Sequence, residues 1–136
     1  MYMLDTNVIV KAIREKEHPI REKILNSCSK GLCISSITYT ELLYGVYHSR
    51  NPEKNLAALH ELLSWIEILP FDLSAAECAG KVMAFLASKG TPLGDRDMLI
   101  AGHALSRNEP LVTHNMRLFK RIPDLHVEDW QDSSDK

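Results

Sequence analysis

The sequence predicts an α/β domain in which helices cover both faces of a parallel sheet. Short apolar runs typical of buried strands alternate with longer helical patterns along the chain, and this alternation is characteristic of parallel sheets with helical crossovers. The 136 residues contain no internal repeat or low-complexity linker, and they are enough for one domain with its own core. We therefore predict a single domain over residues 1–130 and a flexible tail over residues 131–136.

The first half of the chain contains two expected strands and four expected helical segments. They are a strand at 2–5, helices from 6 to about 16 and from 18 to about 29, a strand at 32–36, and helices at about 37–49 and 52–65. Gly31 separates the second helix from the second strand. Pro52 stands at the first position of the last helix, where its missing N–H leaves no hydrogen bond unmade.

The second half continues the alternation with three strands and three helices. They are a strand at 66–71, helices at 74–88 and about 97–106, a strand at 110–114, a short helix at 116–121, and an edge strand at 125–129. Gly90 is expected to cap the first of these helices and Pro92 to stop it. The order of elements therefore supports one parallel sheet built from βα units.

Composition limits the possible functions. No apolar stretch approaches the roughly 20 residues of a membrane span, and the N-terminus lacks the layout of a signal peptide. The three cysteines form no CxxC pair, so we expect reduced thiols and a cytoplasmic protein. The absence of an HExxH motif argues against a zinc hydrolase. With a net charge of −2, any nucleic-acid binding must depend on local positive charge.

Acids and small polar residues follow the expected strands and open one later helix. They are Asp5, Thr6 and Asn7 after the first strand, Ser35 and Ser36 leading to Glu41, Thr113, His114 and Asn115 at the end of the fourth strand, and Asp95 and Asp97 after Gly94. Ligands of open parallel sheets bind beyond the carboxyl ends of the strands, so we expect these groups to converge at one edge. Clustered carboxylates repel one another, and such a cluster favours a hard divalent cation.

Taken singly, these residues also have structural interpretations, which stay open. Helix capping explains three short polar side chains, namely Asp5, Asn7 and Asn115. The segment Thr38–Glu41 has the S/T-x-x-E pattern of a capping box. An acid in a first helical turn, such as Asp95 or Asp97, interacts favourably with the helix dipole. His103 stands in a mostly apolar helix and is expected to be a core or interface histidine.

The ordered combination of four blocks resembles one known family. "MLDTN", "ISSITYTELLYG", "GTPLGDRDMLIAGHALS" and "LVTHNMRLFKRIPDLHVEDW" are similar to the corresponding blocks of VapC toxins, which are PIN-domain ribonucleases. The resemblance runs from about Met3 to Trp130. It implies a PIN-like α/β/α sandwich around a short central parallel sheet, which agrees with the fold expected from the alternation of elements.

The resemblance also implies a set of site residues. Asp5, Glu41 and Asp97 match the three acidic metal-binding positions of the family, and Asn115 matches a fourth position that is often acidic. Asp97 is preferred to Asp95 because it directly precedes "MLIAGHA". We expect Asp5 and Asp97 to bind the metal directly and Glu41 to act directly or through water.

Four neighbouring polar side chains are expected to support these carboxylates by hydrogen bonds. They are Thr6, Asn7, Ser36 and Thr113. Partners of this kind orient metal-binding carboxylates.

By resemblance, the chain is expected to be a metal-dependent endoribonuclease, the toxin of a type II toxin–antitoxin pair. Mg²⁺ or Mn²⁺ is the implied cofactor, because either ion activates water and neutralises phosphate oxygens. The implied partners are a VapB-type antitoxin, a second copy of the chain in a homodimer, and a structured RNA, with initiator tRNA cut in its anticodon loop as the leading candidate.

Two other classes remain open from the residues. One is a phosphatase with an Asp after its first strand, although Asn7 stands where such an enzyme places its second acid. The other is a non-catalytic binding module in which the acids serve only as caps. A specific Mg²⁺ or Mn²⁺ site would separate the binding module from the enzymes.

Overall fold

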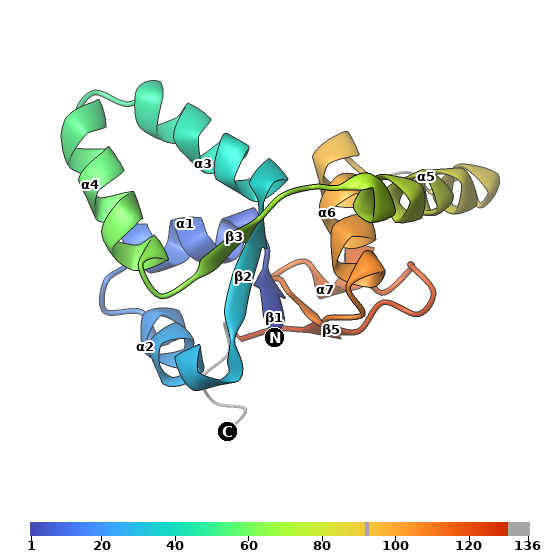
Figure 1. Ribbon diagram of the computed structural model, residues 1–136, viewed down its shortest axis with the longest axis horizontal. Helices are drawn as coiled ribbons and strands as arrows, with labels where there is room; N and C mark the ends of the chain where they lie inside the picture. Colours follow the sequence, from blue (N-terminus) through green and yellow to red (C-terminus); the bar gives the residue numbers. More distant parts are fainter. Residues whose placement is uncertain (92, 131–136) are drawn as a thin grey trace.

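Five strands form one parallel sheet in the order β3-β2-β1-β4-β5 (Figure 1). The computed structural model describes residues 1–91 and 93–130. Its strands are β1 (Tyr2–Leu4), β2 (Leu32–Ser35), β3 (Glu67–Leu69), β4 (Leu111–Val112) and β5 (Val127–Glu128). β1 is central, because Met3 pairs with Cys33 of β2 on one side and with Leu111 of β4 on the other. The residue after β1 therefore lies at the middle of the carboxyl edge of the sheet.

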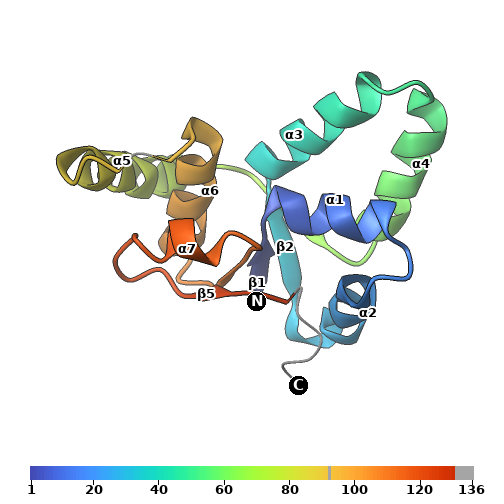
Figure 2. The same cartoon turned by 180° about the vertical axis from the view of Figure 1, so that it is seen from behind.

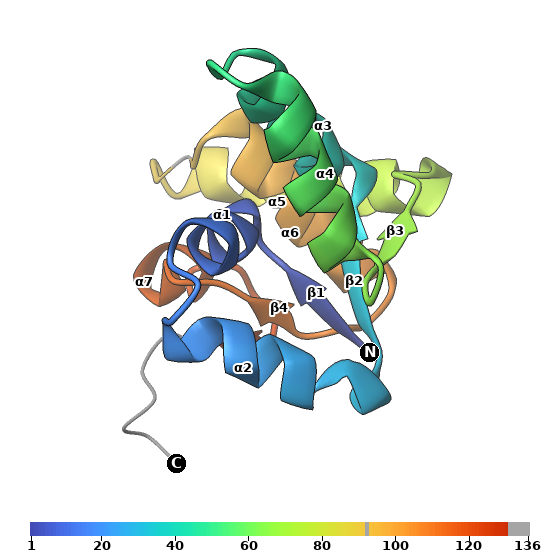
Figure 3. The same ribbon diagram turned by 90° about the vertical axis from the view of Figure 1, so that its left-hand side faces the viewer.

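Helices cover both faces of the sheet. They are α1 (Thr6–Arg14), α2 (Pro19–Asn26), α3 (Ser36–Tyr47), α4 (Pro52–Leu63), α5 (Leu73–Ser88), α6 (Asp95–Ser106) and α7 (Met116–Phe119). The helices α1 to α4 lie on one side and are in front of the strands in Figure 3. The helices α5, α6 and α7 lie on the other side (Figure 2). This arrangement is the expected α/β/α sandwich.

Alternate residues of the strands pack into two separate cores. Leu4 and Ile34 contribute to the core under α1 to α4. Met3 and Cys33 contribute to the core under α5, α6 and α7. A strand covered on both faces is apolar at successive positions, and this explains the uninterrupted apolar runs of β1 and β2.

The packing of α6 against α5 is close because α6 has a glycine at the contact. A Cβ atom at Gly102 would lie 2.4 Å from the Cα atom of Ala79 on α5. Any larger side chain at residue 102 would push the two helices apart. The close contact fixes the position of α6, whose first turn carries Asp95 and Asp97.

The structure confirms the predicted fold class and the predicted order of strands and helices. Most boundaries differ from the predicted ones by one to three residues, and two of these differences affect the interpretation. The helix predicted to begin at Asp97 begins at Asp95, so both acids lie in its first turn. The second helix ends at Asn26, and a 3₁₀ turn over Cys28–Lys30 replaces its predicted end. Gly90 adopts a left-handed φ of 70° just after α5, as its predicted capping role requires.

Two predictions lie outside the described residues, namely the helix stop at residue 92 and the tail at residues 131–136. Within the residues that the structure describes, no helix combines the length and apolar character needed to cross a bilayer.

Candidate active site

The first acid of the candidate site, Asp5, lies at the carboxyl end of β1 and caps α1. Its side chain is only 2% exposed. One carboxylate oxygen accepts a hydrogen bond from the Thr6 backbone N–H at 2.8 Å, and the other accepts from the Thr113 hydroxyl at 2.9 Å. Burial raises the pKa of Asp5 to about 6, the two hydrogen bonds oppose this rise, and the charges of Asp97 and Glu41 add to it. The capping interpretation and the site interpretation of Asp5 are therefore compatible.

The second acid, Glu41, lies on α3 and faces both α1 and α6. One carboxylate oxygen accepts a hydrogen bond from the Thr6 hydroxyl at 2.6 Å. The other pairs with the guanidinium of Arg96 at 3.1 Å. The Glu41 side chain is 21% exposed, whereas the Arg96 side chain is 66% exposed. The Glu41 carboxylate is thus held by the partly buried Thr6 and by the exposed Arg96.

The capping-box interpretation of Glu41 is wrong. The cap of α3 is Ser35, whose hydroxyl accepts a hydrogen bond from the Ile37 backbone N–H at 3.1 Å. Thr38 lies inside the helix, is fully buried, and has its hydroxyl oxygen 3.4 Å from that of Thr6. Both carboxylate oxygens of Glu41 bond instead to the side chains of Thr6 and Arg96, so Glu41 does not close a capping box with Thr38.

The third acid, Asp97, lies in the first turn of α6 and is half-buried. Its pKa is raised, first by burial and then by the charge of Glu41. Asp95, two positions earlier in the same turn, is exposed. Asp97 also acts on the pKa of Asp5, and Asp95 is not among the charges that do so. The geometry therefore favours Asp97 over Asp95 as the member of the acidic group.

The loop after β4 supplies the remaining polar groups. The Thr113 side chain is fully buried, and its hydroxyl donates to Asp5 and accepts from the Asn115 backbone N–H at 3.0 Å. Asn115 stands at the cap position of α7, but its side chain makes no capping hydrogen bond. Its amide is therefore not engaged in the structural role that the capping interpretation assigned to it.

The expected supporting residues separate into two groups. Thr6 and Thr113 hydrogen-bond the carboxylates of Glu41 and Asp5. Asn7 is exposed on α1. The Ser36 hydroxyl accepts a hydrogen bond from the Phe71 backbone N–H at 3.0 Å, so it fixes the connection after β3 instead of a carboxylate.

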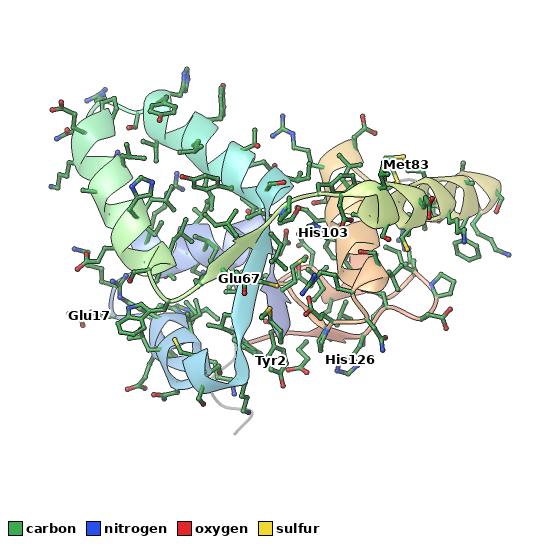
Figure 4. The ribbon with its side chains drawn as sticks, viewed as in Figure 1. Tyr2, Glu17, Glu67, Met83, His103 and His126 are labelled. Atoms are coloured by element: carbon green, nitrogen blue, oxygen red, sulfur yellow. The ribbon has the colours of Figure 1, made fainter. Side chains whose placement is uncertain are left out.

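A buried hydrogen bond joins the two helices that carry Glu41 and Asp97. His103 of α6, labelled in Figure 4, is 1% exposed. Its Nδ1 atom lies 2.7 Å from the hydroxyl oxygen of Ser35, the cap of α3. The ring of Phe71 packs edge-on against the imidazole at 5.5 Å. Burial lowers the pKa of His103. The histidine is a core residue, as predicted, and it also ties α6 to the start of α3.

Sequence reasoning did not identify Arg96 as part of this group. The available signal was its position between two acids, Asp95 and Asp97, in the first turn of a helix. Only the fold shows that its guanidinium reaches a carboxylate 55 positions away.

The donor set fits a hard divalent cation. Asp5, Glu41 and Asp97 offer carboxylate oxygens, Asn115 offers an amide oxygen, and oxygen ligands are those that Mg²⁺ prefers. The raised pKa values of Asp5 and Asp97 show that this environment disfavours negative charge, and a bound cation would reverse that preference. Among the described residues, no three Asp, Glu, His or Cys side chains form a ready-made metal-binding group in this arrangement. Glu41 is turned to Arg96 and Thr6.

The fold is that of a known class of proteins. Residues 2–125 match the family model described as "PIN domain". The chain belongs to the PIN domain family.

Within this family the chain is most readily compared with VapC proteins. It is 47% identical over 129 residues to the tRNA(fMet)-specific endonuclease VapC of Salmonella typhimurium, covering 95% of this chain and 97% of that protein. It is 40% identical over 131 residues to ribonuclease VapC2 of Rickettsia felis, covering 96% and 98% of the two chains. These matches confirm the resemblance to VapC toxins drawn from the four sequence blocks.

Solved structures agree with the sequence matches. The DNA-bound VapBC of Salmonella typhimurium contains a chain with a TM-score of 0.90 to this structure, at 47% identity, covering 95% of this chain and 97% of that chain. A chain of VapBC2 from Rickettsia felis, bound to a promoter DNA fragment, also has a TM-score of 0.90, at 38% identity, with 95% and 98% covered.

Proposed function

We propose that this chain is a metal-dependent endoribonuclease and the toxin of a VapBC-type pair. The observation that carries the proposal is the convergence of Asp5, Glu41 and Asp97 at one end of the parallel sheet, where the charges of Asp97 and Glu41 raise the pKa of Asp5 and the charge of Glu41 raises the pKa of Asp97. A protein that used these acids only as helix caps would have no need to bring them together. Membership in the PIN family and the ribonuclease names of the VapC relatives support the same activity.

The proposed cofactor is Mg²⁺ or Mn²⁺, held by Asp5 and Asp97, by Glu41 directly or through water, and by the amide oxygen of Asn115. When bound, such an ion makes water a better nucleophile and neutralises phosphate oxygens. The protein's own contribution is orientation. Thr6 and Thr113 fix both oxygens of Asp5, so this carboxylate keeps one direction before and after binding.

The proposed substrate is a structured RNA, with the anticodon loop of initiator tRNA as the first candidate. This choice is supported by the tRNA(fMet)-specific relatives that are 47% and 43% identical to the chain. Proteins recognise RNA sequence mainly in unpaired loops, where bases can be splayed out and stacked. With a net charge of −2, contacts to the RNA backbone must depend on local positive charge, and Arg96 is a cation that contacts one of the acids, Glu41.

The proposed protein partner is a VapB-type antitoxin, because the compared structures are VapBC complexes. A hollow of about 220 Å³ between α1, α3 and α4 is lined by Val10, Ile13 and Leu42, and it reaches Glu41. An apolar segment of the antitoxin seated there would lie against the acidic site, in the helix-in-groove mode. We also propose a homodimer acting in the cytoplasm, a compartment that agrees with the three free cysteines.

The test is cleavage of a purified initiator tRNA transcript by toxin freed of antitoxin. We expect cutting within the anticodon loop in Mn²⁺ or Mg²⁺ and none in EDTA. Asp97→Asn is the matched inactive control, because Asn preserves size and polarity but removes the charge. Strong cleavage in EDTA would contradict metal dependence. Failure of the folded, metal-loaded protein to cut any RNA would contradict the enzymatic proposal and favour a binding module.

A further inference from the structure

A hollow of about 390 Å³ lies between α3 and α6, directly beside the acidic group. Its lining residues are Ile37, Thr40, Glu41, Tyr44, Arg96 and Leu99. The volume falls in the range of small-ligand pockets, roughly 300–1,000 Å³. Because Glu41 belongs both to the acidic group and to this wall, a ligand in the hollow would be continuous with one at the acids. A second hollow, of about 400 Å³, lies between α5 and the segment after α7, and its lining does not include Asp5, Glu41 or Asp97.

Arg96, the cation in the wall of this hollow, forms an ion pair with Glu41 that a ligand can replace. Its ion pair with Glu41 is exposed on the arginine side, and exposed ion pairs of this kind contribute little to stability. Arginine binds phosphate oxygens through paired N–H donors better than it binds one carboxylate oxygen. A phosphate that enters the hollow can therefore take Arg96 from Glu41 at small cost.

The aromatic residue of this hollow, Tyr44, is exposed and lies parallel to a neighbouring ring. Its side chain is 64% exposed. The imidazole of His48 stacks on it with a centroid separation of 5.4 Å and an interplanar angle of 10°. An exposed ring of this kind is available for stacking, and stacking on aromatic side chains is the common way to hold unpaired bases.

We propose that this hollow binds the nucleotide next to the cleaved phosphate of a single-stranded RNA segment. Arg96 leaves Glu41 and binds a phosphate of that nucleotide, and Tyr44 stacks on its base. This inference rests on the proposed ribonuclease function and deepens it, because it names an unpaired nucleotide as the feature read beside the acids. The charge of Arg96 beside an apolar and aromatic wall is complementary to a nucleotide, which has an anionic backbone and an apolar base face.

The binding test uses full-length protein in EDTA, so that RNA is bound without being cut. The probe is a fluorescein-labelled anticodon stem-loop, followed by anisotropy. We expect Tyr44→Ala to weaken binding roughly 5- to 150-fold, the range that corresponds to one base–aromatic stack, and Tyr44→Phe to stay close to wild type. Tyr47→Ala is the matched control, since Tyr47 lies one turn along α3 and is 62% exposed; its affinity should stay within about twofold, since it lies outside the proposed stack.

The phosphate contact has its own readout in the salt dependence of binding. Each phosphate contact to single-stranded nucleic acid contributes about 0.7 to the slope of log affinity against log salt concentration. Arg96→Gln should lower the slope by about that amount, and Arg96→Lys should restore most of it. Arg121→Gln, which removes an exposed arginine beyond α7, should leave the slope unchanged.

The possible outcomes distinguish failure of the proposed nucleotide subsite from failure of the proposed ribonuclease activity. If wild-type protein cleaves RNA in Mn²⁺ but Tyr44→Ala and Arg96→Gln bind the stem-loop like wild type, the hollow is not the nucleotide subsite and the inference is wrong, while the ribonuclease proposal stands. If Tyr44→Ala changes the mass of the protein by light scattering without changing its RNA affinity, the hollow is a protein interface, and the inference is again wrong. If wild-type protein neither binds nor cuts RNA, both proposals fail.

Discussion

The two halves of the candidate site differ in how firmly their carboxylates are held. At the end of β1, Asp5 is buried, and both of its oxygens accept hydrogen bonds from donors fixed in the fold. Between α3 and α6, Glu41 is partly exposed, and one of its oxygens pairs with the exposed side chain of Arg96. The β1 half can change partners only if the end of the strand rearranges, whereas the α3–α6 half can change partners by moving one surface side chain.

This difference separates a buried charge that the fold disfavours, at Asp5, from an exposed ion pair that a ligand can replace, at Glu41 and Arg96. Burial of Asp5 raises its pKa to about 6, so at neutral pH the fold carries a charge that it disfavours. Such a cost is typical of functional groups and is relieved when a cation binds. The α3–α6 half carries no comparable burial at Arg96 and is suited to exchange. The predictions below test this contrast, from the largest expected effect to the smallest.

The largest effect is expected for Asp5→Asn, which should remove activity and stabilise the metal-free protein. Loss of a directly coordinating charge should reduce cleavage by more than the roughly 10- to 100-fold typical of an outer hydrogen-bond partner. The folded pKa of Asp5 is raised from 3.8 to about 6, so the stability tied to its protonation is complete below pH 3.8 and is lost as the pH rises through 6. The neutral Asn avoids this loss.

The measurement is thermal melting in EDTA at several pH values. At pH 7.5 the Asp5→Asn variant should melt above wild type, with a gain of at most about 3 kcal/mol for a shift of roughly two pKa units. The gain should shrink as the pH is lowered toward 4, because wild-type Asp5 then becomes protonated. A variant that melts well below wild type at pH 7.5 would show that the Asp5 charge is compensated in the metal-free fold.

The second prediction concerns Glu41→Gln, which should reduce cleavage strongly with little change in stability. Gln still accepts the hydrogen bond from Thr6, and the exposed pair with Arg96 contributes about 0–1 kcal/mol. The lost charge, in contrast, is one that would hold the cation. Melting temperature and initial cleavage rate in Mn²⁺ check the two parts. Near wild-type cleavage by the Gln variant would exclude Glu41 from the metal-binding group.

The fold was predictable from the sequence because its signals are local. The three inner strands β1, β2 and β4 are largely buried runs covered on both faces. Gly31, Pro52 and Gly90 separate neighbouring elements at the expected places. The boundaries were less predictable. The sequence does not show that α6 starts at Asp95, two residues before Asp97, because a helix that starts at either residue has an acid in its first turn.

The site was only partly predictable, because side-chain partners depend on tertiary contacts. The resemblance and the strand ends together indicated Asp5, Glu41 and Asp97, and in the structure the charges of Glu41 and Asp97 raise the pKa of Asp5. The capping box was a wrong interpretation since Ser35, three residues before Thr38, already caps α3. The hydroxyl of Ser36 found a partner 35 positions away, at Phe71. Nothing in the local sequence distinguishes such contacts from the ones expected.

The third prediction probes the firm half of the site through Thr113. Thr113→Val removes a hydroxyl that serves both Asp5 and the Asn115 backbone N–H while preserving the shape of the side chain. We expect a loss of stability of about 1–3 kcal/mol for the buried groups left unpaired and a decrease in Mn²⁺ affinity or cleavage of roughly 10- to 100-fold. Thr113→Ser keeps the hydroxyl and is the matched control. Mn²⁺ titration by electron paramagnetic resonance measures affinity apart from activity.

The smallest effect on cleavage is expected for substitutions of His103, which contacts Ser35 at the start of α3. His103→Asn can keep a hydrogen bond to Ser35, because the Asn side-chain amide occupies nearly the position of Nδ1, whereas His103→Leu cannot. We expect the Leu variant to lose less activity than Thr113→Val, since His103 touches no acid of the site and acts only through the start of α3. The Asn variant should recover most of that loss. Equal activity of the Leu variant and wild type would show that the Ser35 contact does not position Glu41.

The pH dependence of stability gives His103 a second readout. Its folded pKa lies below the ordinary value of 6.5 because the imidazole is buried, although the charge of Asp72 opposes this shift. Below pH 6.5 the unfolded chain therefore binds a proton at this histidine more readily than the folded protein does. The contribution of neutral His103 to the free energy of unfolding is complete above pH 6.5 and is lost as the pH falls below that value. Wild type should thus lose more stability between pH 7.5 and 5.5 than His103→Asn, which has no group to titrate there. Comparing the two proteins cancels the opposite contribution of Asp5, because that carboxylate is common to both. A parallel decline of the two melting curves would show that His103 accepts its proton without cost and that its hydrogen bond to Ser35 survives protonation.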